Sequence, residues 1–124
     1  MKKLLFFGAK NRSDTHVEIN ETKLRKQGFE IIYETSIKKL EKILENDSFF
    51  YIIVDEREDI AIKIIKEMVP MQNVLIVIEK ETNLKNFGEG NSNFKFIKKP
   101  YFTDELIFML NHSVKTSFGV FEGE

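Results

Sequence analysis

Two short apolar runs, Tyr51–Val54 and Val74–Ile78, constrain the fold of this 124-residue chain most strongly. Neither run alternates with polar residues, and a continuous apolar run of this length is typical of a strand that is buried on both faces of a parallel sheet. The segments Leu4–Phe7, Phe29–Tyr33 and Phe94–Ile97 predict three further short strands. The sequence therefore predicts a five-stranded sheet whose central strands are covered on both sides.

Segments with helical spacing separate these strands. The segment after Ser36 repeats apolar residues every three or four positions, and similar stripes begin at Ile60 and Leu106. Weaker helical signals lie before Gly28 and within residues 80–93. Five strands alternating with five helices predict an α/β fold, a three-layer αβα sandwich around a parallel sheet with right-handed crossovers. The predicted helix caps are Ser13 or Asp14, Ser36, and Thr103 or Asp104.

Composition narrows the classes of function. The apolar content of 42% suits one core, so we expect a single domain over residues 1–124. Lys and Arg total 19 against 20 Asp and Glu, which predicts no general attraction to nucleic acid or to an anionic membrane. Without cysteine, and with only His16 and His112, no metal-ligand spacing occurs. No segment approaches the roughly 20 apolar residues of a membrane span, and we expect a cytoplasmic protein.

Two charged residues end predicted strands. Asp55 closes the run from Tyr51, and Lys99 follows the strand that begins at Phe94. In an open α/β sheet the carboxyl ends of the strands form one edge, where binding sites lie, so we expect Asp55 and Lys99 to meet there. The pair could be a structural ion pair, or it could take part in chemistry.

The order of these features resembles the receiver domain of two-component response regulators over nearly the whole chain. The resemblance is carried by Tyr51-Ile52-Ile53-Val54-Asp55 and by Phe96-Ile97-Lys98-Lys99-Pro100-Tyr101, which Thr103-Asp104-Glu105-Leu106 follows at once. It implies the flavodoxin-like strand order 2-1-3-4-5. It also implies that Asp55 is the phosphoacceptor candidate, that Lys99 pairs with it or with phosphoryl oxygens, and that Pro100 follows a cis peptide.

Three departures distinguish the chain from that family. The two acidic Mg²⁺ ligands expected after the first strand are replaced by Gly8-Ala9-Lys10, in which Lys10 could supply a cation in place of the metal. The hydroxyl residue expected after the fourth strand is replaced by Ile78 and Glu79. The loop after Asp55 is also shorter than in the family. We therefore interpret the chain as a degenerate receiver, or pseudo-receiver.

This interpretation predicts a signal-transduction module that is not an enzyme, needs no cofactor and acts by binding a protein of a signalling pathway. Receivers often pair through the face between the fourth strand and the last helix, so a second copy of the chain is a candidate partner. Aromatic residues near the start of the last helix would form that interaction face, namely Tyr101, Phe102 and Phe108.

Two alternatives remain open. In the first, the chain is a phosphorylation-competent receiver that holds Mg²⁺ through a displaced acid such as Asp14, Glu56 or Glu79. In the second, it is a small flavodoxin-like enzyme or ligand-binding domain with a polar pocket at the strand ends. Against nucleotide binding, Gly88-Glu89-Gly90 is too short for a phosphate loop, and no P-loop or dinucleotide fingerprint occurs.

Overall fold

The computed structural model of the chain describes residues 2–8, 19–67, 73–78, 94–99, 101–112 and 116–117. Five parallel strands lie in the order β2-β1-β3-β4-β5, which confirms the predicted flavodoxin-like α/β fold. A two-residue strand, β6, extends the sheet beside β5. The strands are β1 (Lys2–Gly8), β2 (Phe29–Glu34), β3 (Tyr51–Asp55), β4 (Val74–Ile78), β5 (Phe94–Lys98) and β6 (Thr116–Ser117).

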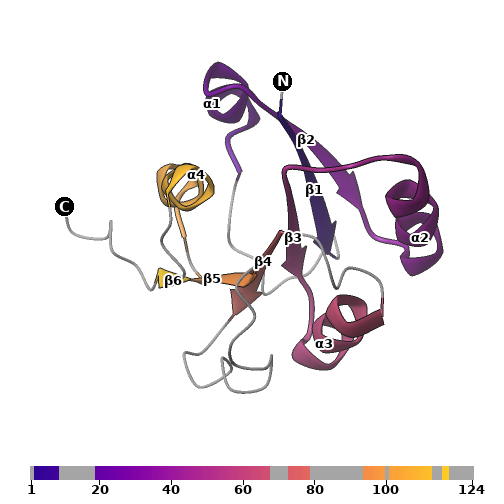
Figure 1. Ribbon diagram of the computed structural model, residues 1–124. Coiled ribbons are helices and arrows are strands. Elements are labelled where there is room, and N and C mark those ends of the chain that lie inside the picture. The colour runs from indigo at the N-terminus through magenta and orange to yellow at the C-terminus, as the bar shows by residue number, and fades with distance from the viewer. Residues whose placement is uncertain are drawn as a thin grey trace.

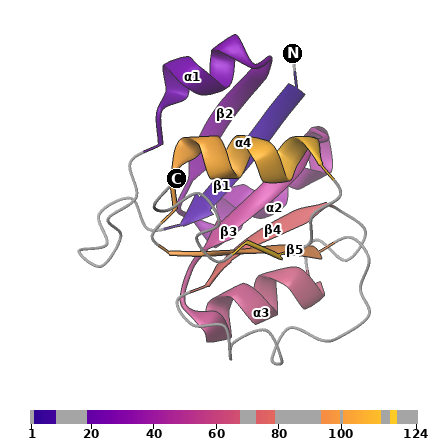
Figure 2. The same ribbon diagram turned by 90° about the vertical axis from the view of Figure 1, so that its left-hand side faces the viewer.

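Four helices in the described residues cover the two faces of the sheet (Figure 1). One core layer packs Leu40 and Ile64 against the face that also buries Phe7. The other packs Leu24 and Leu106 against the opposite face. The turned view in Figure 2 shows α4 and α3 on opposite sides of the strands. The helices are α1 (Glu21–Lys26), α2 (Ile37–Asn46), α3 (Glu58–Glu67) and α4 (Thr103–Asn111).

Two helix starts differ from the sequence prediction. The first helix begins at Glu21, and its cap is Asn20, whose side chain accepts a hydrogen bond from the Lys23 amide at 3.0 Å. The predicted caps Ser13 and Asp14 lie outside the described residues. At α4 the cap position is Phe102, which makes no side-chain cap bond. The predicted cap of α2, Ser36, is confirmed. The helix expected within residues 80–93 lies outside the described residues.

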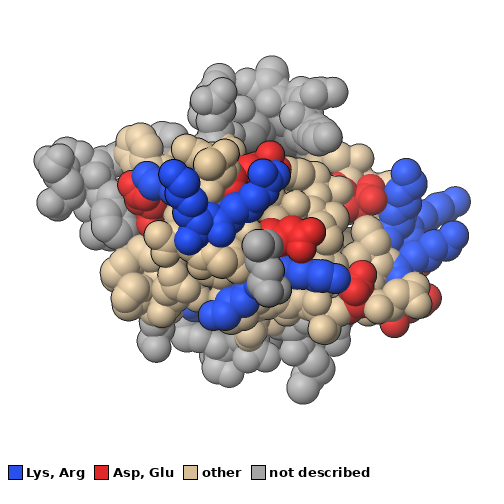
Figure 3. All heavy atoms as spheres, turned by 90° about the horizontal axis from the view of Figure 1, so that it is seen from above, with Lys and Arg blue, Asp and Glu red and all other residues tan. Residues whose placement is uncertain are grey.

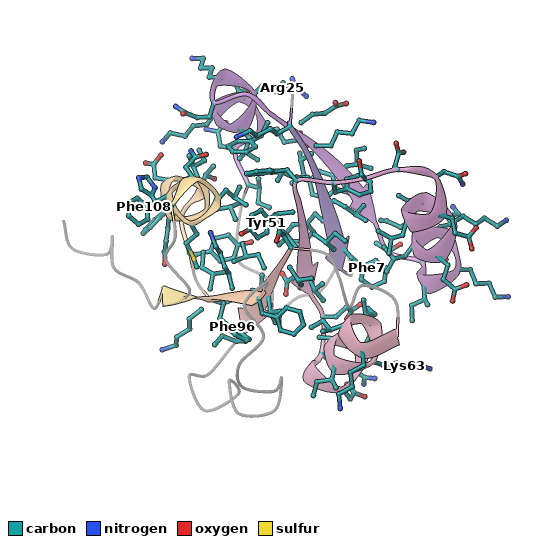
Figure 4. All side chains as sticks on the ribbon, in the orientation of Figure 1. Phe7, Arg25, Tyr51, Lys63, Phe96 and Phe108 are labelled. Atoms are coloured by element: carbon teal, nitrogen blue, oxygen red, sulfur yellow. The ribbon has the colours of Figure 1, made fainter. Side chains whose placement is uncertain are left out.

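The end of α4 is held by a buried lysine from the sheet. The ammonium group of Lys95 in β5 donates hydrogen bonds to the backbone carbonyls of Met109 and His112, the second at 2.6 Å. It also lies 5.1 Å from the centre of the Tyr51 ring, which Figure 4 shows between the sheet and α4. The last turn of α4 contains no basic residue of its own. Lys95 therefore supplies the positive charge that favours a helix C-terminus.

We predict that Lys95→Met lowers the free energy of unfolding by about 1–3 kcal/mol, because it leaves the buried Met109 carbonyl and the partly buried His112 carbonyl without their donor while keeping an apolar side chain of similar length. Urea unfolding measures this change. Lys63→Met is the control, because Lys63 is exposed on α3 and points away from the core in Figure 4; we expect it to change stability by less than about 0.5 kcal/mol. Equal effects of the two substitutions would contradict the anchoring role of Lys95.

Candidate functional site

Asp55 and Lys99 form an ion pair at the carboxyl edge of the sheet. The distance from Lys99 Nζ to Asp55 Oδ1 is 2.8 Å, and the two side chains are only 10% and 4% exposed. The backbone amide of Lys99 donates to the carbonyl of Ile78 at 2.9 Å, which continues the pairing of β5 with β4 past the last residue of the strand. Sheet pairing thus fixes the lysine backbone, and the side chain reaches across β4 to the end of β3. The expected meeting of these two residues is confirmed.

Breaking a pair this well buried is costly. Removal of one partner leaves the other charge uncompensated in a poorly hydrated place, and such changes typically cost about 3–5 kcal/mol. At 2.8 Å the two opposite charges attract one another strongly, because little water screens them. The arrangement therefore holds the ends of β3 and β5 together and fixes the direction in which the Asp55 carboxylate points.

Gly8 lies beside Asp55 on the neighbouring strand. The two residues are register partners in the pairing of β1 with β3. A Cβ atom at Gly8 would overlap the carbonyl oxygen of Asp55 and lie 3.3 Å from its Cβ. Glycine thus permits a close approach of the two strands at this point. The last residue of β1 therefore brings no side chain, acidic or otherwise, to the ion pair.

Of the other predicted site residues, Ile78 lies on the opposite face of the sheet from Asp55, and several are outside the described residues. Ile78 is buried in the core layer that contains α2 and α3. Asp55 continues the alternation of Tyr51 and Ile53, which face α1 and α4. The side chain of Ile78 therefore points away from the face of Asp55. Lys10, Glu79, Pro100 and Asp14 lie outside the described residues.

The loop between Asp55 and α3 is as short as the sequence predicts. Only Glu56 and Arg57 separate the end of β3 from the first residue of α3. Glu56 is half-buried, and its carboxylate accepts a hydrogen bond from the Arg57 amide at 3.2 Å. Within the described part of the chain, no three His, Cys, Asp or Glu side chains are grouped so that they could hold a metal ion.

The aromatic residues expected to form an interaction face separate into two environments. Tyr101 is 5% exposed and belongs to the core beneath α4, which corrects the prediction for this residue. Phe102 is 57% exposed and Phe108 is 36% exposed. Figure 4 shows Phe108 on the outer side of α4, and its ring stacks on that of His112 with centroids 4.2 Å apart. The exposed face is therefore narrower than the sequence suggested.

The burial of three polar residues at and just before the start of α4 was not predicted from the sequence. Tyr101, Thr103 and Glu105 are all buried, although two of them lie in the first turn of α4. The Thr103 hydroxyl accepts a hydrogen bond from the Asn20 amide at 3.0 Å, which ties α4 to the residue that caps α1. No local signal in the sequence marks Thr103 and Glu105 as buried, because polar residues are common in the first turn of a helix.

On the face of the molecule seen from above (Figure 3), surface charges of both signs are mixed. Figure 3, which views the molecule from above, shows basic and acidic side chains side by side. Two exposed ion pairs illustrate this, Lys3 with Asp47 at 3.4 Å and Lys23 with Asp104 at 2.6 Å. Exposed pairs of this kind contribute little to stability. None of the helices in the described residues has the length and apolarity that a membrane span requires.

Comparison of the chain with protein-family models, with curated proteins and with solved structures finds no match in any of the three.

We predict that Gly8→Ala lowers the free energy of unfolding by about 1–3 kcal/mol, because the added methyl group forces β1 away from the Asp55 carbonyl. Chemical denaturation measures the change. Gly28→Asn is the control substitution. Gly28 has a φ of 89° with open space around it, and asparagine tolerates positive φ better than most residues. We therefore expect this substitution to lower the free energy of unfolding by less than about 1 kcal/mol. A Gly8→Ala protein as stable as the parent would show that the close approach is unimportant.

Proposed function

We propose that the chain is a receiver-like signal-transduction module that acts by protein–protein contact, without ordinary Mg²⁺-dependent phosphorylation of Asp55. The observation that carries the proposal is the buried ion pair between Asp55 and Lys99, formed beside a glycine. An aspartate at the end of β3 and a lysine directly after β5 are the two receiver active-site features that the chain retains. Their direct pairing, next to a strand end that offers no acid, favours a structural role for both.

Phosphoryl transfer to a carboxylate requires neutralisation of the charge on the transferring oxygens, which Mg²⁺ supplies in many enzymes. Asp55 alone gives such an ion one ligand, and Gly8 adds no side chain. Glu56 is the nearest acid along the chain, but its carboxylate accepts from the adjacent backbone amide. These features support a module whose output is binding rather than catalysis. A cytoplasmic location belongs to the same proposal.

The contact surface in this proposal is the outer side of α4 with its preceding residue. Phe102 and Phe108 are two of the three large apolar side chains that are clearly exposed in the described residues; the third, Ile37, lies on α2 across the sheet. Exposed aromatic residues are enriched where proteins bind one another. The partner is a protein of a signalling pathway or a second copy of the chain.

Incubation of the protein with acetyl phosphate and Mg²⁺, followed by intact-mass measurement, tests the proposal. We expect no phosphoryl adduct, while a receiver domain with both acidic residues after its first strand acquires one under the same conditions. The matched variant is Asp55→Asn. An adduct that forms on the parent chain and disappears in this variant would establish the phosphorylation-competent alternative instead.

A further inference from the structure

The hydroxyl group of Tyr101 is buried without a protein partner. The side chain is 5% exposed, and no atom of the described residues forms a hydrogen bond with its hydroxyl oxygen. Most buried tyrosine hydroxyls are hydrogen-bonded, because an unsatisfied buried donor is unfavourable. Its ring packs with Ile53 and Ile97 in the core layer beneath α4, so the hydroxyl cannot swing out to solvent without loss of that packing.

Two carboxylates lie within electrostatic reach of this hydroxyl. Burial raises the pKa of Tyr101, and the charge of Asp55 and then the groups of Tyr33 and Glu105 act in the same direction. Asp55 is held by Lys99 on one side, and an ionised carboxylate has about four sites that can accept hydrogen bonds. A buried water needs two to four polar partners, and these groups can supply them.

The start of α4 depends on contacts outside the helix. Its cap residue, Phe102, offers no side-chain acceptor, although its carbonyl accepts from the amides of Glu105 and Leu106 at 3.0 and 3.1 Å. Tyr101 directly precedes this cap. Thr103 directly follows it and accepts from the Asn20 amide. A displacement of the Tyr101 ring would therefore move the first turn of α4 and its contact with α1.

We infer that an ordered water bridges the Tyr101 hydroxyl and the Asp55 carboxylate, and that Tyr101 thereby couples the state of Asp55 to the start of α4. Tyr101 is in this sense a positioning residue. The inference goes beyond the proposed function, because it requires only that the Asp55 carboxylate can change its charge or its partner. The water bridge would also connect the buried ion pair with α4, on which Phe108 is exposed and which Phe102 precedes.

Backbone NMR of Asp55→Asn tests the coupling. We expect the substitution to shift the amide resonances of Asn20 and Leu106, and the shift to fall by at least about twofold when Tyr101→Phe is also present, as non-additivity within one hydrogen-bond network requires. The amide of Leu40, which donates to the Ser36 carbonyl on the opposite face of the sheet, serves as the reference, and its resonance should not shift. Shifts at Asn20 of the same size with and without the Tyr101 hydroxyl would overturn the inference.

Tyr51→Phe is the matched control for the loss of a hydroxyl. Tyr51 is buried in the same core layer beside the ammonium group of Lys95, and burial raises its pKa without the carboxylate charges that act on Tyr101. In this background the effect of Asp55→Asn should be retained in full. A second measurement needs no variant: the Tyr101 hydroxyl proton should exchange slowly and show a cross-peak to bound water. Rapid exchange of that proton would contradict the water bridge independently of the proposed function.

Discussion

The contact between Asp55 and Lys99 is the interaction on which the carboxyl edge of the sheet depends. It joins the end of β3 to the residue after β5 across the intervening strand, at 2.8 Å and almost entirely out of solvent. A buried carboxylate and a buried ammonium group are each unfavourable alone, so each requires the other. The glycine at the end of β1 lets the neighbouring backbone approach this pair closely. Together these features make the edge a packed structural element.

A series of buried polar groups extends from this pair to α4. Lys95 holds the C-terminal carbonyls of the helix, and Thr103 fixes its first residue to Asn20. Both ends of α4 are thus determined by hydrogen bonds to other parts of the chain, while its middle packs through apolar side chains such as Leu106. Such polar contacts add specificity of position to the non-directional apolar core. The position of α4, and with it the positions of the exposed Phe108 and of Phe102 before the helix, therefore depends on contacts with the sheet and with Asn20.

Much of the fold was predictable because its signals are local. The run Val74–Ile78 has no polar residue, which indicates a strand buried on both faces. Ser36 precedes apolar residues at three- and four-residue spacing, which is typical of a capped amphipathic helix. The meeting of Asp55 with a lysine 44 positions later was also predictable, since parallel strands end at one edge. The start of α1 was not, because several residues before it are equally good caps and the helix buries a single residue, Leu24.

The buried polar residues could not be predicted in the same way. Thr103 reads as a helix cap in the sequence, but its hydroxyl serves a residue 83 positions away, and no local pattern contains that information. From the sequence, Tyr101 is expected on an interaction face because it lies near the start of the last helix, where receiver domains often pair. Its burial depends on how α4 returns over the sheet. Long-range contacts of this kind are set by tertiary packing, which overrides local preference.

We propose that the Asp55 carboxylate pairs with Lys99 and does not bind a metal ion. An NMR titration with MgCl₂, compared with NaCl at equal ionic strength, tests it most directly through the amides of Gly8, Asp55 and Lys99. The account predicts that the two salts give the same small, unsaturable shifts. A saturable shift at these three amides with Mg²⁺ alone would contradict it.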